Sequence, residues 1–395
     1  MRLFAVFTAA VLAVSLTLAQ SKKEIIGANP NSQAPLSPAV KAGGFIYVSG
    51  TAGVAGGKGD IKGQAKNALD NISARLQQAG SSMANAVSVS VYLRNASDFP
   101  GLNEVYGTYW PKDPPARTTV IVDGTPAADG LFEISVIAVP NGGERTIVRP
   151  SDWSNSPLPY SYGIKSGDTV FLAGLVSRNG KDNSNVKGDI TVQTKYVLDN
   201  GAAILKQAGM SLADVVQSRV YLTDAANFQA MNSAYHSYFP SSPPARATLR
   251  TGLTSPDYLI EISMIAVKDA SRTAITTPNA DGSPGTANPN LSAAIRVGNR
   301  LFVAGITGNT ADNKGDAAAQ TKEALARIAR TVKAAGFQMS DMVEGMAYAA
   351  DRTKFPEINA AYKEAFQRDF PARTGVSTGL MGAGAEIELS FIAVK

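Results

Sequence analysis

PPART, at Pro114 to Thr118, is the stretch that decides how this chain folds, because it returns as PPARA at Pro243 to Ala247 and as FPART at Phe370 to Thr374. The arginines of the three strings are spaced 129 and 127 residues apart. A period of this kind indicates repeated structural units, and it takes priority over the assignment of single elements.

Other residue types keep fixed distances from these arginines in all three copies. A glutamine lies 53 residues before each arginine, and a glycine, a phenylalanine, an asparagine and a tyrosine follow that glutamine by 16, 35, 39 and 42 residues. Chance does not hold five residue types at fixed offsets three times. We therefore predict three copies of one domain, at residues 30–140, 155–268 and 286–395. The segments between them, residues 140–157 and 276–289, contain proline and glycine and are expected to be exposed, flexible linkers.

Each copy shows an alternation of strand and helix patterns. In the first copy the apolar run Phe45–Val48 and the alternating stretch Val87–Leu93 predict strands. The apolar spacing from Ala65 to Leu76 predicts an amphipathic helix, and Gly80 stands where a glycine ends such a helix. A second helix is expected before the PPART string.

Two more strands follow that string, at Thr118–Val122 and Phe132–Val139. A short loop joins them, so we expect them to pair as an antiparallel hairpin. The resulting order of elements predicts an α+β fold, with one sheet and helices on one side of it. The bare face of that sheet needs a partner, and three sheets around a common axis would supply it within a single polypeptide.

The amino terminus has the pattern of a secretory signal peptide. Arg2 precedes an apolar run from Leu3 to Leu18, and small residues lie near the expected cleavage point at Ala19–Gln20. A membrane anchor is the alternative, but the run is short for a spanning helix, which needs ~20 apolar residues. We therefore expect residues 1–19 to be removed and the protein to be exported, periplasmic or secreted, without a membrane partner after cleavage.

The composition excludes several classes of function. The chain has no cysteine, so neither a disulfide nor a thiolate nucleophile is available. Its net charge of +5 is not gathered into a basic stripe, so we expect no nucleic-acid partner. The sequence also contains no Ser-His-Asp set, no metal-ligand cluster and no phosphate-binding loop, so no metal site is expected.

The repeated segments resemble the Rid (YjgF-type) family of enamine/imine deaminases. The resemblance rests on PLSPAV, PYSYGI and NLSAAI at residues 35–40, 159–164 and 290–295, on the P-A-R elements, and on the final strands FEISVIAV, IEISMIAV and IELSFIAV. It implies chorismate-mutase-like (YjgF-type) domains that form a trimer with ligand sites between subunits, here a monomeric chain acting as a pseudo-trimer. It also implies hydrolysis of small reactive 2-imino or enamino acids to 2-keto acids and ammonia, without a cofactor.

Imine hydrolysis needs a cation for the substrate carboxylate and a group that positions water and carries a proton. A guanidinium binds carboxylate bidentately, which suits Arg117, Arg246 and Arg373. Glutamates in an apolar strand suit the second task, because burial raises their pKa while a nearby arginine lowers it; they are Glu133, Glu261 and Glu388. The resemblance adds substrate-binding residues, which are Tyr160, Ser49, Asn103, Asn232, Asn359, Thr119 and Thr248.

The copies depart from the family pattern at different positions. The tyrosine survives only as Tyr160, with leucine in the other copies, and the serine of the strand end survives only as Ser49, with alanine in the others. The third counterpart of Thr119 and Thr248 is Gly375. The three sites therefore cannot be equivalent, and we expect at most one or two of them to turn over.

Structural roles for the same residues stay open at this point. Arginine and glutamate on adjacent strands of one copy can form a buried ion pair that holds the hairpin. The asparagines can cap or fasten the second helix, and the tyrosines three residues further on fit the core. His236, the only histidine, fits a solvated helix position.

Two functions compete on this basis. One is the hydrolytic deaminase, and the other is a module that binds small carboxylates or keto acids without changing them. Export and the missing tyrosine and serine favour the second. A ribonuclease, which is an old description of the Rid family, finds no support, because the sequence offers neither a basic groove nor a suitable pair of general acid and base.

Overall fold

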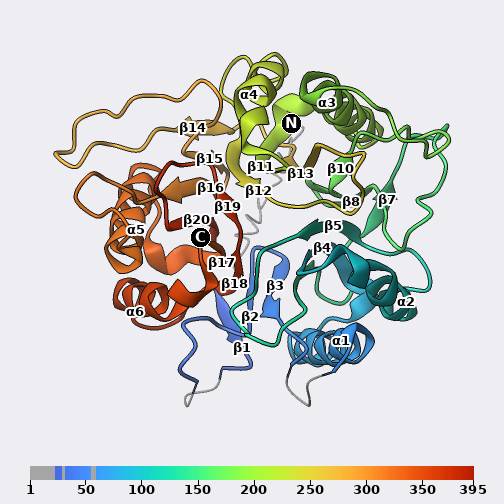
Figure 1. Ribbon diagram of the computed structural model, residues 1–395, viewed down its shortest axis with the longest axis horizontal. Helices are drawn as coiled ribbons and strands as arrows, with labels where there is room; N and C mark the ends of the chain where they lie inside the picture. Colours follow the sequence, from blue (N-terminus) through green and yellow to red (C-terminus); the bar gives the residue numbers. More distant parts are fainter. Residues whose placement is uncertain (1–22, 29–31, 55–58) are drawn as a thin grey trace, which may run out of the picture.

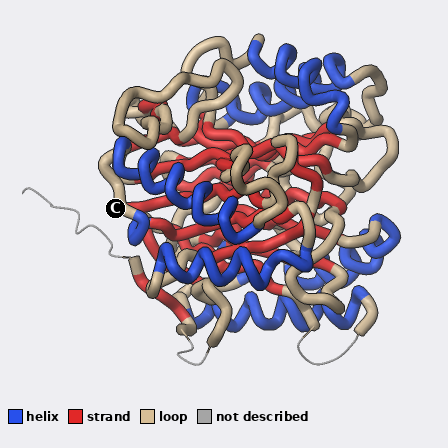
Figure 2. The backbone as a smooth tube through the Cα atoms, turned by 60° about the vertical axis from the view of Figure 1, so that its left-hand side comes forward, coloured by secondary structure: helices blue, strands red, loops and turns tan. Residues whose placement is uncertain are grey.

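The computed structural model describes residues 23–28, 32–54 and 59–395. The predicted signal peptide lies outside the described residues. Three similar units surround a common centre, and each turns a sheet inward and two helices outward (Figure 1). In a view turned by 60° the strands again occupy the middle and the helices the outside (Figure 2). The predicted α+β fold of three domains in a pseudo-trimer is confirmed.

The first unit is a six-stranded sheet with two long helices. In sheet order its strands are β1 (Glu24–Ile26), β2 (Ala39–Ala42), β3 (Phe45–Thr51), β6 (Phe132–Ala138), β4 (Ala86–Leu93) and β5 (Ala116–Ile121). The helices are α1 (Ile61–Gln78) and α2 (Phe99–Tyr109). Strands β4 and β5 are parallel, and the other neighbours are antiparallel.

The predicted hairpin of β5 and β6 is wrong. Strand β4 lies between them, because helix α2 returns the chain to the end of the sheet where β4 began, so that β5 runs parallel to β4. Strand β6 then pairs antiparallel with the other edge of β4 and with β3. The two strands that carry the arginine and the glutamate of one copy are therefore not neighbours.

The second and third units repeat this order. The second contains β7 (Thr146–Val148), β8 (Gly163–Ser166), β9 (Thr169–Leu172), β10 (Leu175–Val176), α3 (Ile190–Gln207), β11 (Val215–Leu222), α4 (Phe228–His236), β12 (Ala245–Arg250) and β13 (Ile260–Val267). The third contains β14 (Thr273–Ile275), β15 (Ala294–Val297), β16 (Arg300–Thr307), α5 (Ala317–Ala334), β17 (Met342–Ala349), α6 (Phe355–Phe366), β18 (Ala372–Ser377) and β20 (Ile387–Val394). The short strand β19 (Gly379–Leu380) of the third copy pairs antiparallel with β12 and so extends the sheet of the second unit. Single 3-10 turns are Met83–Asn85, Ala96–Asp98, Leu212–Asp214, Ala225–Asn227, Met339–Asp341 and Arg352–Lys354.

The two segments predicted to be flexible linkers contain or adjoin short β-strands. Strand β7 lies within residues 140–157 and pairs with β8, and β14 lies directly before residue 276 and pairs with β15. Both occupy the position that β1 has in the first unit. The chain therefore enters each sheet through an edge strand before the rest of the copy begins.

Local signals fix the long helix of each unit. Its first turn is capped by an aspartate side chain, from Asp60, Asp189 or Asp316. Its end is followed by a glycine at φ of +76°, +73° or +79°, at Gly80, Gly209 and Gly336, as the sequence predicted for the first copy.

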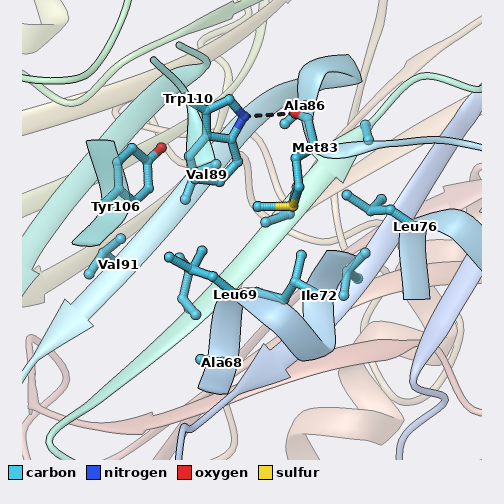
Figure 3. Close-up of a cluster of buried hydrophobic side chains, with 14 of the residues drawn as sticks. Ala68, Leu69, Ile72, Leu76, Met83, Ala86, Val89, Val91, Tyr106 and Trp110 are labelled. Atoms are coloured by element: carbon cyan, nitrogen blue, oxygen red, sulfur yellow. Dashed lines mark hydrogen bonds between the residues drawn. The ribbon is translucent and has the colours of Figure 1, made fainter. Parts of the chain in front are cut away.

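Each unit has its own core between sheet and helices, and all three share another. In the first unit Leu69, Ile72 and Leu76 of α1 pack with Val89 and Val91 of β4 (Figure 3). The shared core joins residues of all three copies, among them Tyr47, Val87, Phe171, Val216, Phe302 and Val343. Within the described residues no helix is long and apolar enough to cross a membrane, and no cluster of three acids or histidines suits a metal ion.

Candidate active site between neighbouring copies

The three P-A-R elements lie at the boundaries between copies, where a serine of the next copy fastens each of them. Ser161 donates its backbone N–H to the Pro115 carbonyl at 3.0 Å and its hydroxyl to the Pro114 carbonyl at 2.6 Å. The equivalent pairs are Ser292 with Pro244 and Pro243, and Ser37 with Pro371 and Phe370. Each arginine is thereby presented to the following copy, and the third copy presents its arginine to the first.

Each of the three arginines is buried against a tyrosine ring of its own copy. The guanidinium carbons lie 4.6, 4.7 and 4.7 Å from the ring centroids in the pairs Arg117–Tyr106, Arg246–Tyr235 and Arg373–Tyr362. Such a cation–π contact contributes about 2 kcal/mol when it is desolvated. These tyrosines therefore belong to the core, and they also hold the arginine.

The predicted asparagines stand beside the arginines. Asn232 Oδ1 accepts a hydrogen bond of 2.6 Å from Arg246 Nη2, and Asn359 Oδ1 accepts one of 2.6 Å from Arg373 Nη2. The Oδ1 atom of Asn103 is buried without a partner. Two of the three asparagines therefore orient the guanidinium, and the third has an oxygen left for another donor.

The glutamate that faces each arginine comes from the following copy. Glu261 accepts a hydrogen bond of 3.3 Å from the Thr119 backbone N–H; burial raises its pKa, and this bond and the charge of Arg117 oppose the rise. The other facing pairs are Arg246 with Glu388 and Arg373 with Glu133. The alternative of an ion pair within one copy is wrong, because β4 separates the two strands.

Burial and a facing arginine act on all three glutamates. Burial raises the pKa of each to about 8, while the facing arginine opposes the rise. A carboxyl group of this pKa is mostly protonated at pH 7, so it can donate a proton and its conjugate base can take one back. Burial also lowers the pKa of the three arginines, but a guanidinium remains charged in a protein.

The carboxyl groups rest on backbone where the third strand of each unit ends. A Cβ atom added at Gly50, Gly174 or Gly305 would lie 2.3, 1.8 or 1.8 Å from the glutamate Oε1 atom of the same copy. Only glycine leaves that space, so the glycine after Ser49, Ala173 and Ala304 shapes the site. This close approach, rather than an unusual backbone angle, explains the glycine.

Several polar atoms of the site are buried without a partner. They are Nη1 of Arg117, Nε and Nη1 of Arg246 and of Arg373, and the hydroxyls of Thr119 and Thr248. Leaving a buried donor unsatisfied costs about 1–3 kcal/mol, and more for a charged group. Their gathering beside a protonated carboxyl suits a small ligand that carries a carboxylate.

A comparison with known families decides the relationship. The family model described as Endoribonuclease L-PSP matches residues 26–140, 154–268 and 283–395. The chain belongs to this family. It is the family of the YjgF, RidA and RutC proteins, whose members are imine deaminases or bind small molecules, so the predicted resemblance to Rid proteins is confirmed.

Individual L-PSP family proteins match one copy at a time. A RutC family protein of Sulfurisphaera tokodaii is 46% identical over 110 residues, which are 28% of this chain and 88% of the relative, and one of Pyrococcus horikoshii is 46% identical over 111 residues, again 28% and 88%. Among solved structures, RidA of a Psychrobacter species is 27% identical over 31% of this chain and 98% of its own, with a TM-score of 0.29. TdcF of E. coli with bound serine is 26% identical over 31% and 99%, with a TM-score of 0.30.

The three interfaces of this L-PSP family chain are not equivalent. The first, between copies one and two, combines Arg117 and Thr119 with Tyr160 and Glu261. The second combines Arg246 and Thr248 with Glu388 and has neither the tyrosine nor the serine. The third receives Ser49 with Arg373 and Glu133. Tyr160 and Ser49 thus lie at different interfaces, in agreement with the expectation that the three sites are not equivalent.

Ser49 is tied into the framework of its interface. Its hydroxyl donates to the Ser37 carbonyl at 2.5 Å and accepts from the Arg373 backbone N–H at 3.0 Å. One lone pair of that hydroxyl is left for a ligand. The role of Ser49 is therefore at least partly to join the first and third copies.

Clefts open beside the first two interfaces. A cavity of about 540 Å³ is lined by Asn103, Tyr160 and Arg149 among others, and one of about 470 Å³ is lined by His236, Leu291 and proline and threonine residues of the second linker. The imidazole of His236 makes a contact of 3.1 Å with the Pro289 carbonyl, so it belongs to a cleft wall rather than to a simple solvated helix face.

Some residues of the site escaped the sequence analysis. The serines at 37, 161 and 292 were visible in the PLS, PYS and NLS strings. No sequence signal near them indicated that they bind the preceding copy. Arg178, whose charge lowers the pKa of Glu261, carried no repeated signal, because it has no counterpart in the other copies.

Proposed function

We propose that the chain hydrolyses small reactive 2-imino or enamino acids to 2-keto acids and ammonia at the interfaces between copies. The observation that carries this proposal is the threefold meeting of a buried, incompletely bonded arginine with a glutamate whose pKa burial raises to about 8. Each meeting joins two copies.

The chemistry divides between these two groups. The guanidinium holds the substrate carboxylate, and its fixed orientation places the imine carbon near the glutamate. The protonated glutamate gives its proton to the imine nitrogen as water adds to the carbon, and the resulting carboxylate takes a proton from the added water. When that proton passes to the nitrogen, the C–N bond breaks and the hydroxyl gives its proton to the glutamate carboxylate. The keto group forms, ammonia leaves and the glutamate is protonated again, so that imino acid plus water becomes keto acid plus ammonia.

The pKa values predict the pH dependence of this reaction. Because the acid form of the glutamate starts the reaction, kcat/KM should be constant at lower pH and fall as the pH rises through about 8. The imine also hydrolyses in buffer, so the enzyme-dependent rate has to be obtained by subtraction at each pH.

A test compares the chain from residue 20 onward with its triple variant Glu133→Gln/Glu261→Gln/Glu388→Gln. An amino acid oxidase generates 2-iminopropanoate or 2-iminobutanoate, and keto-acid release is followed. The proposal expects release faster than in buffer, lost in the triple variant and kept in Glu104→Gln, whose side chain is exposed on α2. No rate above that of buffer would overturn it.

The second candidate is a binding module for small carboxylates or keto acids. The loss of the tyrosine and the serine at the second interface favours it there, since of the predicted site residues the arginine, asparagine, threonine and glutamate remain. Calorimetry with 2-oxobutanoate measures this function directly. Binding without hydrolysis by the wild type would establish it.

We also propose that the protein works outside the cytoplasm. The support is the basic, apolar and small-residue pattern of residues 1–19. Amino-terminal sequencing of the protein from the cell envelope and the medium tests this, and an intact Met1 in the cytosolic fraction would contradict it.

A further inference from the structure

Copy two carries two residues that the other copies lack at equivalent positions. Tyr160 corresponds to Leu36 and Leu291. Arg178 lies four residues after Gly174, where the first copy has Val54 and the third has Asn309. The tyrosine and the extra arginine therefore occur together, and both belong to the first interface.

The two side chains are directly bonded. Arg178 Nη2 donates a hydrogen bond to the Tyr160 hydroxyl, and the Arg178 guanidinium carbon lies 5.9 Å from the Tyr160 ring centroid. Arg117 lies at the same distance, 5.9 Å, from that ring. Tyr160 is therefore in contact with the proposed substrate cation and with a second cation, and the first interface is where such a cation bonds a tyrosine, because the other copies have leucine in place of Tyr160.

Neighbouring residues fix the positions of both Arg178 and Tyr160. The Arg178 backbone N–H donates to the Val176 carbonyl at 2.8 Å, and its carbonyl accepts from Asn200 of α3 at 2.8 Å. The Tyr160 ring packs edge-on against Tyr162 at 5.8 Å. Such support lets one hydrogen bond define the direction of the tyrosine hydroxyl.

The direction of the phenol proton follows from this bond. A hydroxyl that accepts from Arg178 keeps its own proton for another acceptor, and the described residues supply none within hydrogen-bonding distance. Tyr160 lines the cleft of about 540 Å³ beside this interface, and its ring joins that cleft to Arg117, which is buried outside the cleft lining, 5.9 Å from the ring, and has a free Nη1. The proton is therefore available to an anionic ligand that Arg117 holds.

We propose that Arg178 is a positioning residue that directs the Tyr160 hydroxyl at the substrate carboxylate, and that it makes the first interface the main site of turnover. The inference rests on the proposed imine hydrolysis. Glu261 fits the same assignment, because it lies near both Arg117 and Arg178, whereas Glu388 at the second interface has Arg246 as its nearby cation.

The first experiment measures kcat and KM for 2-iminobutanoate with Tyr160→Phe, Arg178→Met, Arg178→Lys and the double variant Tyr160→Phe/Arg178→Met. Each of the first two should lose about tenfold in kcat/KM, the equivalent of one hydrogen bond to a charged group. The double variant should lose little more than either, and Arg178→Lys should recover part of the loss. Additive losses, or no loss in Arg178→Met, would overturn the inference.

Calorimetry separates this inference from the proposed function. Arg178→Met should bind 2-oxobutanoate about tenfold more weakly than the wild type at the first interface, whether or not any hydrolysis is seen. A background with Arg246→Met and Arg373→Met removes the other two sites from the measurement. Unchanged affinity would sink the positioning role even if the chain is an active deaminase, and an inactive wild type with the weaker Arg178→Met binding would sink only the hydrolysis.

Transfer of the pair to the second interface is the gain-of-function test. The substitution Glu261→Gln first inactivates the first interface. In that background, the variant Leu291→Tyr/Asn309→Arg should raise the remaining kcat/KM above that of Leu291→Tyr alone. The single variant is the matched control, since it adds the phenol without the cation that orients it. Equal rates in the two variants would contradict the role given to Arg178.

Discussion

At the scale of single residues, the site depends on where the carboxyl of each glutamate can lie. The carboxyl lies on the backbone of a glycine in its own copy, with the arginine of the preceding copy facing it. This packing excludes water from the carboxyl and so raises its pKa. The same glycine therefore provides both the space and the desolvation on which the proposed hydrolysis depends.

Gly174→Ala tests this dependence. Its Cβ would lie 1.8 Å from Oε1 of Glu261, so the carboxyl must leave its position and reach more water. We expect the activity of the first interface to fall at least tenfold and the descending limb of the pH profile to move below pH 8. Gly63→Ala is the control, because its Cβ would meet nothing closer than 3.4 Å, and unchanged kinetics in Gly174→Ala would contradict this account.

The protonated glutamates also predict how stability depends on pH. Each pKa is raised from 4.5 to about 8 on folding, so between these values the folded state binds more protons than the unfolded state. Stability is therefore fully present below pH 4.5 and falls as pH rises to about 8, by up to about 1.4 kcal/mol per pH unit for each glutamate.

Glu388→Gln should abolish one third of this effect. Measured by denaturant unfolding at pH 5, 7 and 8.5, the variant should gain stability over the wild type as pH rises. Glu104→Gln should show no such trend. Parallel curves for Glu388→Gln and the wild type would show that the carboxyl is not buried in its neutral form.

At the scale of elements, a buried glutamine joins each long helix to the loop before the strand of the glutamate. Gln193 donates to the Gly188 and Asp257 carbonyls at 3.2 and 3.0 Å and accepts from the Leu259 N–H at 2.9 Å. Gln64 and Gln320 do the same in their copies. The glutamine that marked the repeat is thus a structural clamp.

Gln193→Leu should destabilise the protein by about 1–3 kcal/mol, because it leaves buried backbone groups without partners. It should also lower the activity of the first interface, since the loop that it releases leads into β13 and Glu261. Thermal unfolding and kinetics measure both effects. Gln77→Leu, on the exposed side of α1, is the control, and an equal effect of the two substitutions would argue against the clamp.

The sequence predicted where the helices and strands lie along the chain better than which strands pair in the sheet. Hydrophobic periodicity and the repeated glycine located α1 and the strands, because both are local signals. The pairing of β5 and β6 was wrong, since a short loop was taken as a hairpin although a helix before β5 already required a parallel crossover beside β4. The meeting of Glu261 with Arg117 could not be predicted, because the order of copies around the axis leaves no trace in any one copy.

At the scale of the whole molecule, covalent linkage replaces association of separate subunits. The arginine of the third copy meets the glutamate of the first, so the ring of interfaces closes within one chain. We therefore expect a monomer in solution, of the mass of a single chain. Sedimentation velocity measures this, and a species of three chains would contradict it.

The order of copies is also marked by one asymmetric pair near the axis. Arg219 Nη2 of β11 lies 2.9 Å from Glu344 Oε1 of β17, and both side chains are nearly buried. The equivalent positions hold Ser90 and Met346 for the arginine, and Ser88 and Gln217 for the glutamate. Copy two therefore has a partner for its buried arginine only in copy three.

This pair predicts a pattern that no symmetric trimer would show. Arg219→Met should cost about 3–5 kcal/mol, because it leaves Glu344 buried without its partner. The double variant Arg219→Met/Glu344→Gln should recover most of that loss, since it removes both charges together. Unfolding midpoints of the two variants and of Glu344→Gln complete a double-mutant cycle. A double variant as unstable as the sum of the singles would show that the two charges act separately and that copy order is specified elsewhere.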